Sequence, residues 1–274
     1  MDPYPCYLSS NPIFKFAAVP DAAWALEGDF HKRLNTINFI LYHKSTKWVN
    51  YNMKRKDVII REFSLKKKKI LTSDDLKAVC DKYGFDFRRT KISLMNKGYL
   101  LTIFRGIYYL RDFNEKKTGV IKYSADELLS QGLRLKGVEN WYFGLNTALK
   151  MMNLTHEIFA VDYVLNERFN RVRPMKILGS NFLFMKIKPS LFSFGIKKTM
   201  TANNISINYS DAEKTLLDMA YLYGLSGKSR EAIISLIEEY AGDVDKKKLI
   251  NYAKNYPKTI RKIIAEALGW TKKS

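Results

Sequence analysis

The sequence predicts an α+β fold, in which a helical N-terminal region closed by a β-hairpin precedes a mixed α/β region. Two short amphipathic stretches, residues 72–83 and 86–97, are separated by a turn at Gly84. Residues 99–110 are rich in aromatic and β-branched side chains and are interrupted at Arg105 and Gly106, which is typical of a tight hairpin. Helix, short turn, helix and hairpin in this order predict a winged helix-turn-helix over residues 53–111.

Both predicted helices carry start and stop signals. Thr72 or Ser73 is the expected N-cap of the first helix, because short polar side chains bond the unpaired amides there. Asp86 is the expected cap of the second helix, and Gly98 ends it where a positive φ costs glycine least. The first helix has Asp74 and Asp75 in its first turn, and its apolar face consists of Leu76, Val79 and Cys80.

The second helix has the residues of a DNA-reading helix. With Phe87 and Leu94 taken as its buried side, helical periodicity places Ile92 and several polar side chains on the opposite side. Arg reads guanine edges, Asn reads adenine, and an aliphatic side chain can touch a thymine methyl, so we expect this helix to enter a major groove. The alternative is an ordinary solvated helix face. The polar side chains expected to read bases are Arg88, Arg89, Ser93 and Asn96.

The charge of the chain supports a polyanionic partner. Lys and Arg number 47 against 27 Asp and Glu, a formal net charge of +20, and such an excess attracts polyanions through counterion release. We expect double-stranded DNA as the partner, with Arg105 touching the minor groove or backbone beside the recognition helix. The lysine run before the first helix could equally be a solvated helix end. The expected phosphate contacts are Lys66, Lys67, Lys68, Lys69, Lys91 and Lys97.

The rest of the chain predicts a second domain. Residues 112–137 are expected to be a linker and a short helix, and residues 138–274 a C-terminal domain. A helix is predicted over residues 138–155 from the apolar stripe that includes Trp141 and Leu145. A small, mostly antiparallel sheet is predicted from β-type runs at residues 158–164, 172–177, 182–187 and 205–209. Helices are expected at residues 210–223, 230–240 and 246–268, the first with Ser210 and Glu213 at capping-box spacing.

Catalytic motifs are weak in this chain. Gly227-Lys228-Ser229 opens a helix as a phosphate-binding loop would, but Leu222 stands where that motif needs glycine. Gly179-Ser180 is similar to the start of a nucleotidyltransferase site, but no carboxylate follows until Asp211. No Cys or His lies at zinc-binding spacing. We therefore expect no enzymatic activity, cofactor or metal; the alternative is a nucleic-acid-processing enzyme that a winged helix delivers to its substrate.

The cysteine count and the length of the apolar runs indicate the cellular compartment. Only Cys6 and Cys80 are present, which excludes a disulfide framework and fits a reducing compartment. No uninterrupted apolar run approaches the length of a membrane span, and we expect a cytoplasmic protein. Residues 1–52 predict no independent core, and we expect them to be an upstream extension of a chain whose functional start is Met53.

Three segments, taken together, resemble a known family. They are Phe104-Arg105-Gly106-Ile107-Tyr108-Tyr109 at the predicted wing, Trp141-Tyr142-Phe143-Gly144-Leu145-Asn146-Thr147-Ala148-Leu149, and Tyr209-Ser210-Asp211-Ala212-Glu213-Lys214-Thr215-Leu216-Leu217-Asp218. In this order they resemble the AbiEi antitoxin and transcriptional-regulator family. The resemblance implies a winged helix joined to an α/β domain, repression of the chain's own operon, and antagonism of a nucleotidyltransferase-like toxin in a type IV toxin-antitoxin system. A plain transcriptional regulator without a toxin is the other reading, and the oligomeric state stays open.

Overall fold

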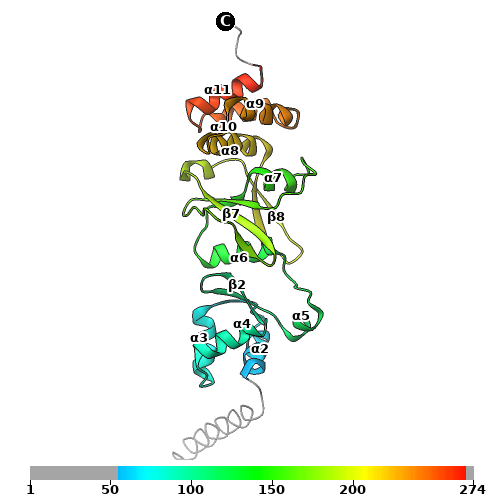
Figure 1. Cartoon of the computed structure of the whole chain (residues 1–274), viewed down its shortest axis with the longest axis vertical. Helices are drawn as coiled ribbons and strands as arrows, with labels where there is room; N and C mark the ends of the chain where they lie inside the picture. Colours follow the sequence, from blue (N-terminus) through cyan, green and yellow to red (C-terminus); the bar gives the residue numbers. More distant parts are fainter. Residues whose placement is uncertain (1–54, 270–274) are drawn as a thin grey trace, which may run out of the picture. The chain divides into compact units, whose positions relative to one another are not determined.

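The computed structural model describes residues 55–269, and the prediction for residues 1–52 lies outside this part of the chain. The described residues form an α+β structure of ten α-helices, a three-stranded antiparallel sheet and a six-stranded mixed sheet (Figure 1). The N-terminal elements are α2 (Arg55–Leu65), β1 (Ile70–Thr72), α3 (Ser73–Lys82), α4 (Phe87–Asn96), β2 (Leu100–Phe104) and β3 (Ile107–Leu110).

The capping signals predicted for the first two helices are confirmed. Thr72 caps α3 in a reciprocal capping box with Asp75, and Asp86 caps α4 by accepting a hydrogen bond from the amide of Arg89. The hairpin turns at Arg105 and Gly106, and Gly106 has a φ of +83°. Strand β1 was not predicted; it pairs with β3, so that the sheet order is β1-β3-β2. The residues buried between this sheet and α2 to α4 include Ile59, Phe63, Leu76, Cys80, Leu94 and Tyr108.

The six-stranded sheet has the order β6-β7-β5-β4-β9-β8. Strand β5 runs parallel to β7 and β4 runs parallel to β9, while the other three pairings are antiparallel, so the predicted mostly antiparallel sheet is a mixed one. The predicted strand runs correspond approximately to β5, β6, β7 and β9, whereas β4 and β8 were not predicted. The strands are β4 (Trp141–Phe143), β5 (Asp162–Asn166), β6 (Met175–Ile177), β7 (Ser180–Lys186), β8 (Ile196–Met200) and β9 (Ser206–Ser210).

Two predicted segments differ from the structure between residues 112 and 155. The expected linker contains α5 (Phe113–Thr118), which Asp112 caps and which was not predicted, whereas the short helix expected after it is confirmed as α6 (Ala125–Leu135). The single helix expected over residues 138–155 is wrong, because its first part is strand β4 and only α7 (Leu145–Met151) is helical. Gly144 separates the two, and a Cβ there would lie 2.6 Å from Cδ1 of Leu165 on the paired strand. The aromatic side chains of Trp141 to Phe143 are buried on both faces of the sheet.

Helix α6 joins the two sheets through one hydrophobic cluster. Phe104 and Ile107 of the small sheet, Leu128 and Leu133 of α6, and Phe184 of the large sheet all belong to it. Gly132 allows the closest approach, since a Cβ there would lie 2.7 Å from the ring of Phe104. The position of the β2–β3 hairpin is therefore set in part by packing against α6.

The C-terminal helices pack around α8 (Ala212–Leu225), the longest helix in the described part of the chain (Figure 1). The predicted helix over residues 246–268 is interrupted, because Pro257 cannot continue a hydrogen-bonded helix from the preceding turn. No helix within residues 55–269 is long and apolar enough to cross a membrane. The other elements are the 3-10 turns η1 (Pro189–Phe192) and η2 (Ala241–Asp243), and the helices α9 (Arg230–Glu239), α10 (Lys246–Ala253) and α11 (Lys258–Ala267).

Candidate nucleic-acid interface

The outward face of α4 carries most of the side chains predicted to read bases. Arg88, Arg89 and Asn96 are exposed, whereas Ser93 is half-buried and therefore less accessible than expected. The buried side of the helix consists of Thr90 and Leu94, and Phe87 is only partly buried. The exposed face also presents apolar surface: Ile92 is 47% exposed and Met95 39%. Such a mixture of guanidinium, amide and aliphatic groups can contact the base edges of a nucleic acid.

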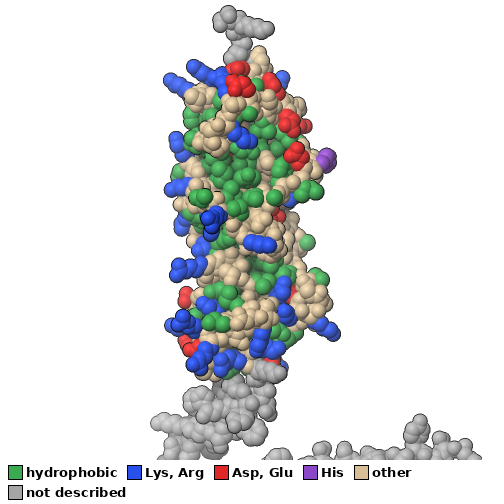
Figure 2. All heavy atoms as spheres, viewed as in Figure 1, with side chains coloured by type: hydrophobic (Ala, Val, Ile, Leu, Met, Phe, Trp, Pro, Cys, Tyr) green, Lys and Arg blue, Asp and Glu red, His purple; other side chains and the backbone are tan. Residues whose placement is uncertain are grey.

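The arginines of this face have no acidic partner in the part of the chain that the structure describes. Among residues 55–269, no ion pair involves Arg88, Arg89 or Arg105. Arg105 lies at the turn of the β2–β3 hairpin, and the backbone there is tied to the start of α3 by a hydrogen bond from the amide of Ser73 to the carbonyl of Gly106, 2.9 Å long. Lys91 is half-buried over the ring of Phe87, with its Nζ 5.5 Å from the ring centroid, and Lys97 is exposed. Lys and Arg side chains gather over the surface formed by α2 to α4 (Figure 2).

The four-lysine run does not present a uniform cationic patch. Nζ of Lys66 lies 3.2 Å from Glu62 and Nζ of Lys68 lies 2.8 Å from Asp75. Lys67 has no ion-pair partner among the described residues and has a positive φ of 51°. Because two of the exposed lysines are paired with carboxylates, their charge is partly neutralised before any ligand arrives.

Lys69 belongs to a structural cluster rather than to the surface. Its Nζ lies 2.6 Å from Asp112 and 2.8 Å from Glu115, and Glu115 also accepts a hydrogen bond from the hydroxyl of the buried Tyr109. Burial disfavours the charged form of Lys69, but the two carboxylates outweigh this and raise its pKa above the ordinary value. This side chain joins β1 to the start of α5, so phosphate contact, as predicted for it, would require breaking both ion pairs.

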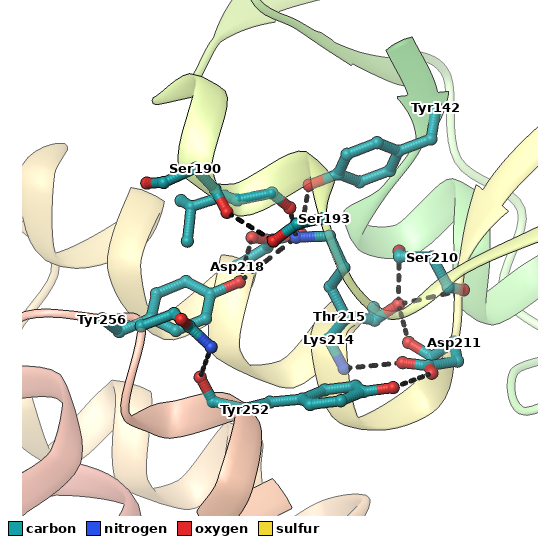
Figure 3. A network of polar contacts seen from close by, with 12 residues as sticks. Tyr142, Ser190, Ser193, Ser210, Asp211, Lys214, Thr215, Asp218, Tyr252 and Tyr256 are labelled. Atoms are coloured by element: carbon teal, nitrogen blue, oxygen red, sulfur yellow. Dashed lines mark hydrogen bonds and ion pairs between the residues drawn. The ribbon is translucent and has the colours of Figure 1, made fainter. Parts of the chain in front are cut away.

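A second group of polar residues, contributed by α8, β4 and the turn between α10 and α11, is buried (Figure 3). Lys214 and Asp218 are both fully buried, with Nζ and Oδ2 3.5 Å apart. Asp218 accepts hydrogen bonds from the hydroxyls of Tyr142 at 2.7 Å and Tyr256 at 2.6 Å, while Lys214 donates to the carbonyl of Leu191 at 2.7 Å. Burial raises the pKa of Asp218 and lowers that of Lys214, because each charge is removed from water.

Charged side chains at the start of α8 lie beside this group: Asp211 and Glu213 are buried and contact the half-buried Lys248 of α10. The N-cap is Asp211 rather than the predicted Ser210; its Oδ1 accepts from the amide of Lys214, and Ser210 bonds the hydroxyl of Thr215 instead. Nζ of Lys248 lies 2.9 Å from Asp211 and 2.8 Å from Glu213, so α10 is held against the start of α8. Hydrogen bonds from Lys248 to Glu213 and Asp211 outweigh the effect of burial and raise the pKa of this lysine.

Contacts within the protein account for the polar residues of the segment from Tyr209 to Asp218. Asp211, Glu213, Lys214 and Asp218 are each paired within the protein, and the Lys214–Asp218 pair has no exposed surface at which a substrate could bind. Sequence reasoning missed Tyr142, Tyr256 and Lys248, because no local pattern places residues so distant in the chain around one ion pair.

The weak catalytic motifs lie apart from both sites. Gly227-Lys228-Ser229 follows helix α8, where a phosphate-binding loop needs a strand, and Nζ of Lys228 lies 3.9 Å from the ring centroid of Tyr223. Gly179 and Ser180 form the turn and first strand residue of the β6–β7 hairpin. In the part of the chain that the structure describes, no group of three or more His, Cys, Asp or Glu residues could hold a metal ion.

Comparison with known proteins supports the architecture. A comparison with protein-family models found no match for this chain, and a comparison with curated protein sequences found none either. Among solved structures, the RV2827C protein from Mycobacterium tuberculosis is similar, with a TM-score of 0.52, 11% sequence identity, and a match that covers 78% of this chain and 76% of that one. At this identity the similarity concerns the fold alone, and it shows that an arrangement like this one occurs in a crystal structure.

Proposed function

We propose that this protein is a sequence-specific DNA-binding repressor, in which α3, α4 and the β2–β3 hairpin form a winged helix-turn-helix. The observation that carries the proposal is the exposed face of α4, where Arg88, Arg89 and Asn96 lie next to Ile92, and where the arginines have no carboxylate partner among the described residues. Asp86 caps this helix, and Thr90 and Leu94 on its other side are buried. The exposed arginines and Asn96 are therefore held on a rigid helix.

Each exposed group has a separate role in the proposal. Arg88 and Arg89 read guanine edges and Asn96 reads adenine. Ser93 is half-buried and therefore contributes less to base recognition. Lys97, Lys91 and Lys67 contact phosphates and supply affinity without sequence information. Arg105 at the hairpin turn contacts the neighbouring backbone or minor groove. Lys66 and Lys68 contribute less, since each is already paired with a carboxylate.

The test compares binding of the full chain to its own upstream DNA and to a random duplex of equal length, over a range of salt concentrations. Arg89→Ala should lose about 1 to 3 kcal/mol on the upstream DNA and much less on random DNA. Lys67→Ala should weaken binding to both duplexes alike and reduce the salt slope by about one. Lys262→Ala, which changes an exposed cation of α11, is the matched control and should change neither. Equal losses on both duplexes for Arg89→Ala would contradict recognition by α4.

The antitoxin role is a finer proposal that rests on the sequence resemblance to the AbiEi family. It predicts that the chain represses its own promoter and protects cells against a nucleotidyltransferase-like toxin encoded beside it. Co-expression of that toxin with the wild-type chain and with Arg89→Ala separates the two activities. If Arg89→Ala loses repression but still protects, antitoxicity does not require DNA recognition by α4; if the wild-type chain does not protect, the chain is a regulator without an antitoxin role.

A further inference from the structure

A cavity of about 320 Å³ lies between the β2–β3 hairpin and the loop that follows β5. Four cationic side chains line it: Arg105 from the hairpin turn, Lys136 from the end of α6, and Arg168 and Arg171 from the loop. No acidic residue lines the cavity, and none of these four cations forms an ion pair within residues 55–269. Four like charges brought together without a counter-charge repel one another, and an anion would relieve that repulsion.

The loop that carries two of these arginines is held by a buried side chain. Asn166 is fully buried at the end of β5, and its Oδ1 accepts hydrogen bonds from the amides of Arg168 at 2.9 Å and Phe169 at 2.8 Å. Its Nδ2 donates to the carbonyl of Phe169 at 2.9 Å. The amide of Arg171 donates to the carbonyl of Phe184 on β7, also at 2.9 Å. The backbone that presents the guanidinium groups is therefore fixed before any ligand binds, which reduces the entropy cost of binding.

The cavity also has an aromatic wall. Phe104 and Phe169 line it, and both rings pack on Phe184 behind them, with centroid separations of 6.0 Å and 5.1 Å. Nζ of Lys136 lies 5.5 Å from the centroid of Phe104. Phe169 is half-buried and offers most of the surface of this wall, because Phe104 is only 4% exposed. A planar base can cover such an apolar surface, whereas a phosphate cannot use it.

We propose that this cavity binds a nucleotide, with the phosphates on Arg105, Arg168 and Arg171 and the base against Phe104 and Phe169. Guanidinium groups pair with phosphate oxygens in a bidentate manner, and the volume falls within the range of small-molecule sites. The phosphates of a DNA duplex are an alternative occupant. The bases of a duplex are paired and stacked inside it, however, so they cannot enter a cavity that contacts the DNA backbone. A free nucleotide uses both the cations and the aromatic wall.

The test is equilibrium binding to the full chain at physiological ionic strength, with ADP and GDP as probes. Adenosine and inorganic phosphate each carry half of the recognised chemistry. We expect saturable binding of ADP or GDP with a Kd below about 1 mM, and at least tenfold weaker binding of both adenosine and phosphate. Absence of saturable binding by either nucleotide would overturn the proposal, and so would phosphate binding as tightly as the nucleotides, because the aromatic wall would then contribute nothing.

Matched variants locate the site. Arg168→Gln combined with Arg171→Gln should weaken nucleotide binding at least tenfold, since both cations are removed while polar side chains of similar size remain. Arg173→Gln is the control: it lies in the same loop and is exposed, but it does not line the cavity. Equal weakening by the control would mean general charge attraction and would overturn the proposal. The binding assay contains no DNA, so its outcome is independent of the proposed repressor function.

Discussion

Lys214→Met is predicted to destabilise the C-terminal part of the chain more than any surface substitution. The change keeps the length and apolar stem of the side chain but removes a fully buried ammonium whose Nζ lies 3.5 Å from Oδ2 of Asp218 (Figure 3). Asp218 would keep the hydroxyls of Tyr142 and Tyr256 as donors but lose its only counter-charge among the described residues. The carbonyl of Leu191 would lose the donor that lies 2.7 Å away.

The magnitude follows from the geometry. Two unit charges at this separation attract by about 5 kcal/mol at an effective dielectric constant of about 20. Removing one partner of a buried ion pair typically costs about 3 to 5 kcal/mol, because the remaining charge is left without compensation. We therefore expect the free energy of unfolding to fall by about 3 to 5 kcal/mol. Asp218→Asn should have a similar cost, since it leaves the ammonium of Lys214 buried and unpaired.

The assay is urea unfolding of the two single variants and of the combined Lys214→Met and Asp218→Asn variant, followed by tryptophan fluorescence and circular dichroism. The combined variant has no buried charge, so its loss should be smaller than the sum of the single losses by about 2 kcal/mol or more. Lys262→Met on the exposed surface of α11 is the control and should change the stability by less than about 0.5 kcal/mol. Additive losses would refute the reasoning, because they would mean that the two side chains contribute independently.

Two further predictions concern other elements. Hydrogen bonds from Tyr83, Lys82 and Lys66 lower the pKa of Glu62 from 4.5 to about 2. Its stabilising contribution should therefore be present above about pH 4.5 and lost as the pH falls toward 2. Because Lys66 and Lys82 are half exposed, solvent screening limits this contribution to about 1 kcal/mol. Unfolding of Glu62→Gln should lack this part of the acid sensitivity, and a pH profile equal to that of the wild type would contradict the assignment. Gly195→Ala should cost about 3 kcal/mol, because φ is +65° and the new Cβ would lie 2.8 Å from Cβ of Lys214. Gly84→Ala, where φ is +66° and no atom lies within 4 Å, should cost only about 1 to 2 kcal/mol. Thermal unfolding of both variants measures these costs, and equal costs would exclude crowding as the cause.

The N-terminal elements were predictable because their signals are local. Thr72 and Asp86 cap the helices that follow them directly, and Gly106 supplies the positive φ of the hairpin turn directly before strand β3. Strand β1 was missed for a related reason: Ile70 to Thr72 is too short to show a period, and its identity as a strand depends on pairing with β3, more than 30 residues away in the sequence.

The buried ion pair was not predictable, because its local signal has two readings. Lys214 and Asp218 are four residues apart on one helix, which is the usual spacing of a solvent-exposed pair. Their burial depends on Tyr142, which is 76 residues from Asp218, and on Tyr256, which is 38 residues from it. The error over residues 138–155 has the same origin, since the apolar stripe around Trp141 fits a helix as well as a strand buried on both faces.

The packing of Phe104 against α6 has a consequence for both proposed ligands. Gly132 leaves no room for a larger residue beneath that ring, so the hairpin turn is positioned by α6 and by the hydrophobic cluster behind it. Arg105, at that turn, lines the proposed nucleotide cavity and also belongs to the proposed DNA contact. One guanidinium cannot bind a nucleotide phosphate and a DNA phosphate with full strength at the same time. If both proposals hold, linkage requires that a bound nucleotide lower the affinity for DNA and that DNA lower the affinity for the nucleotide by the same factor.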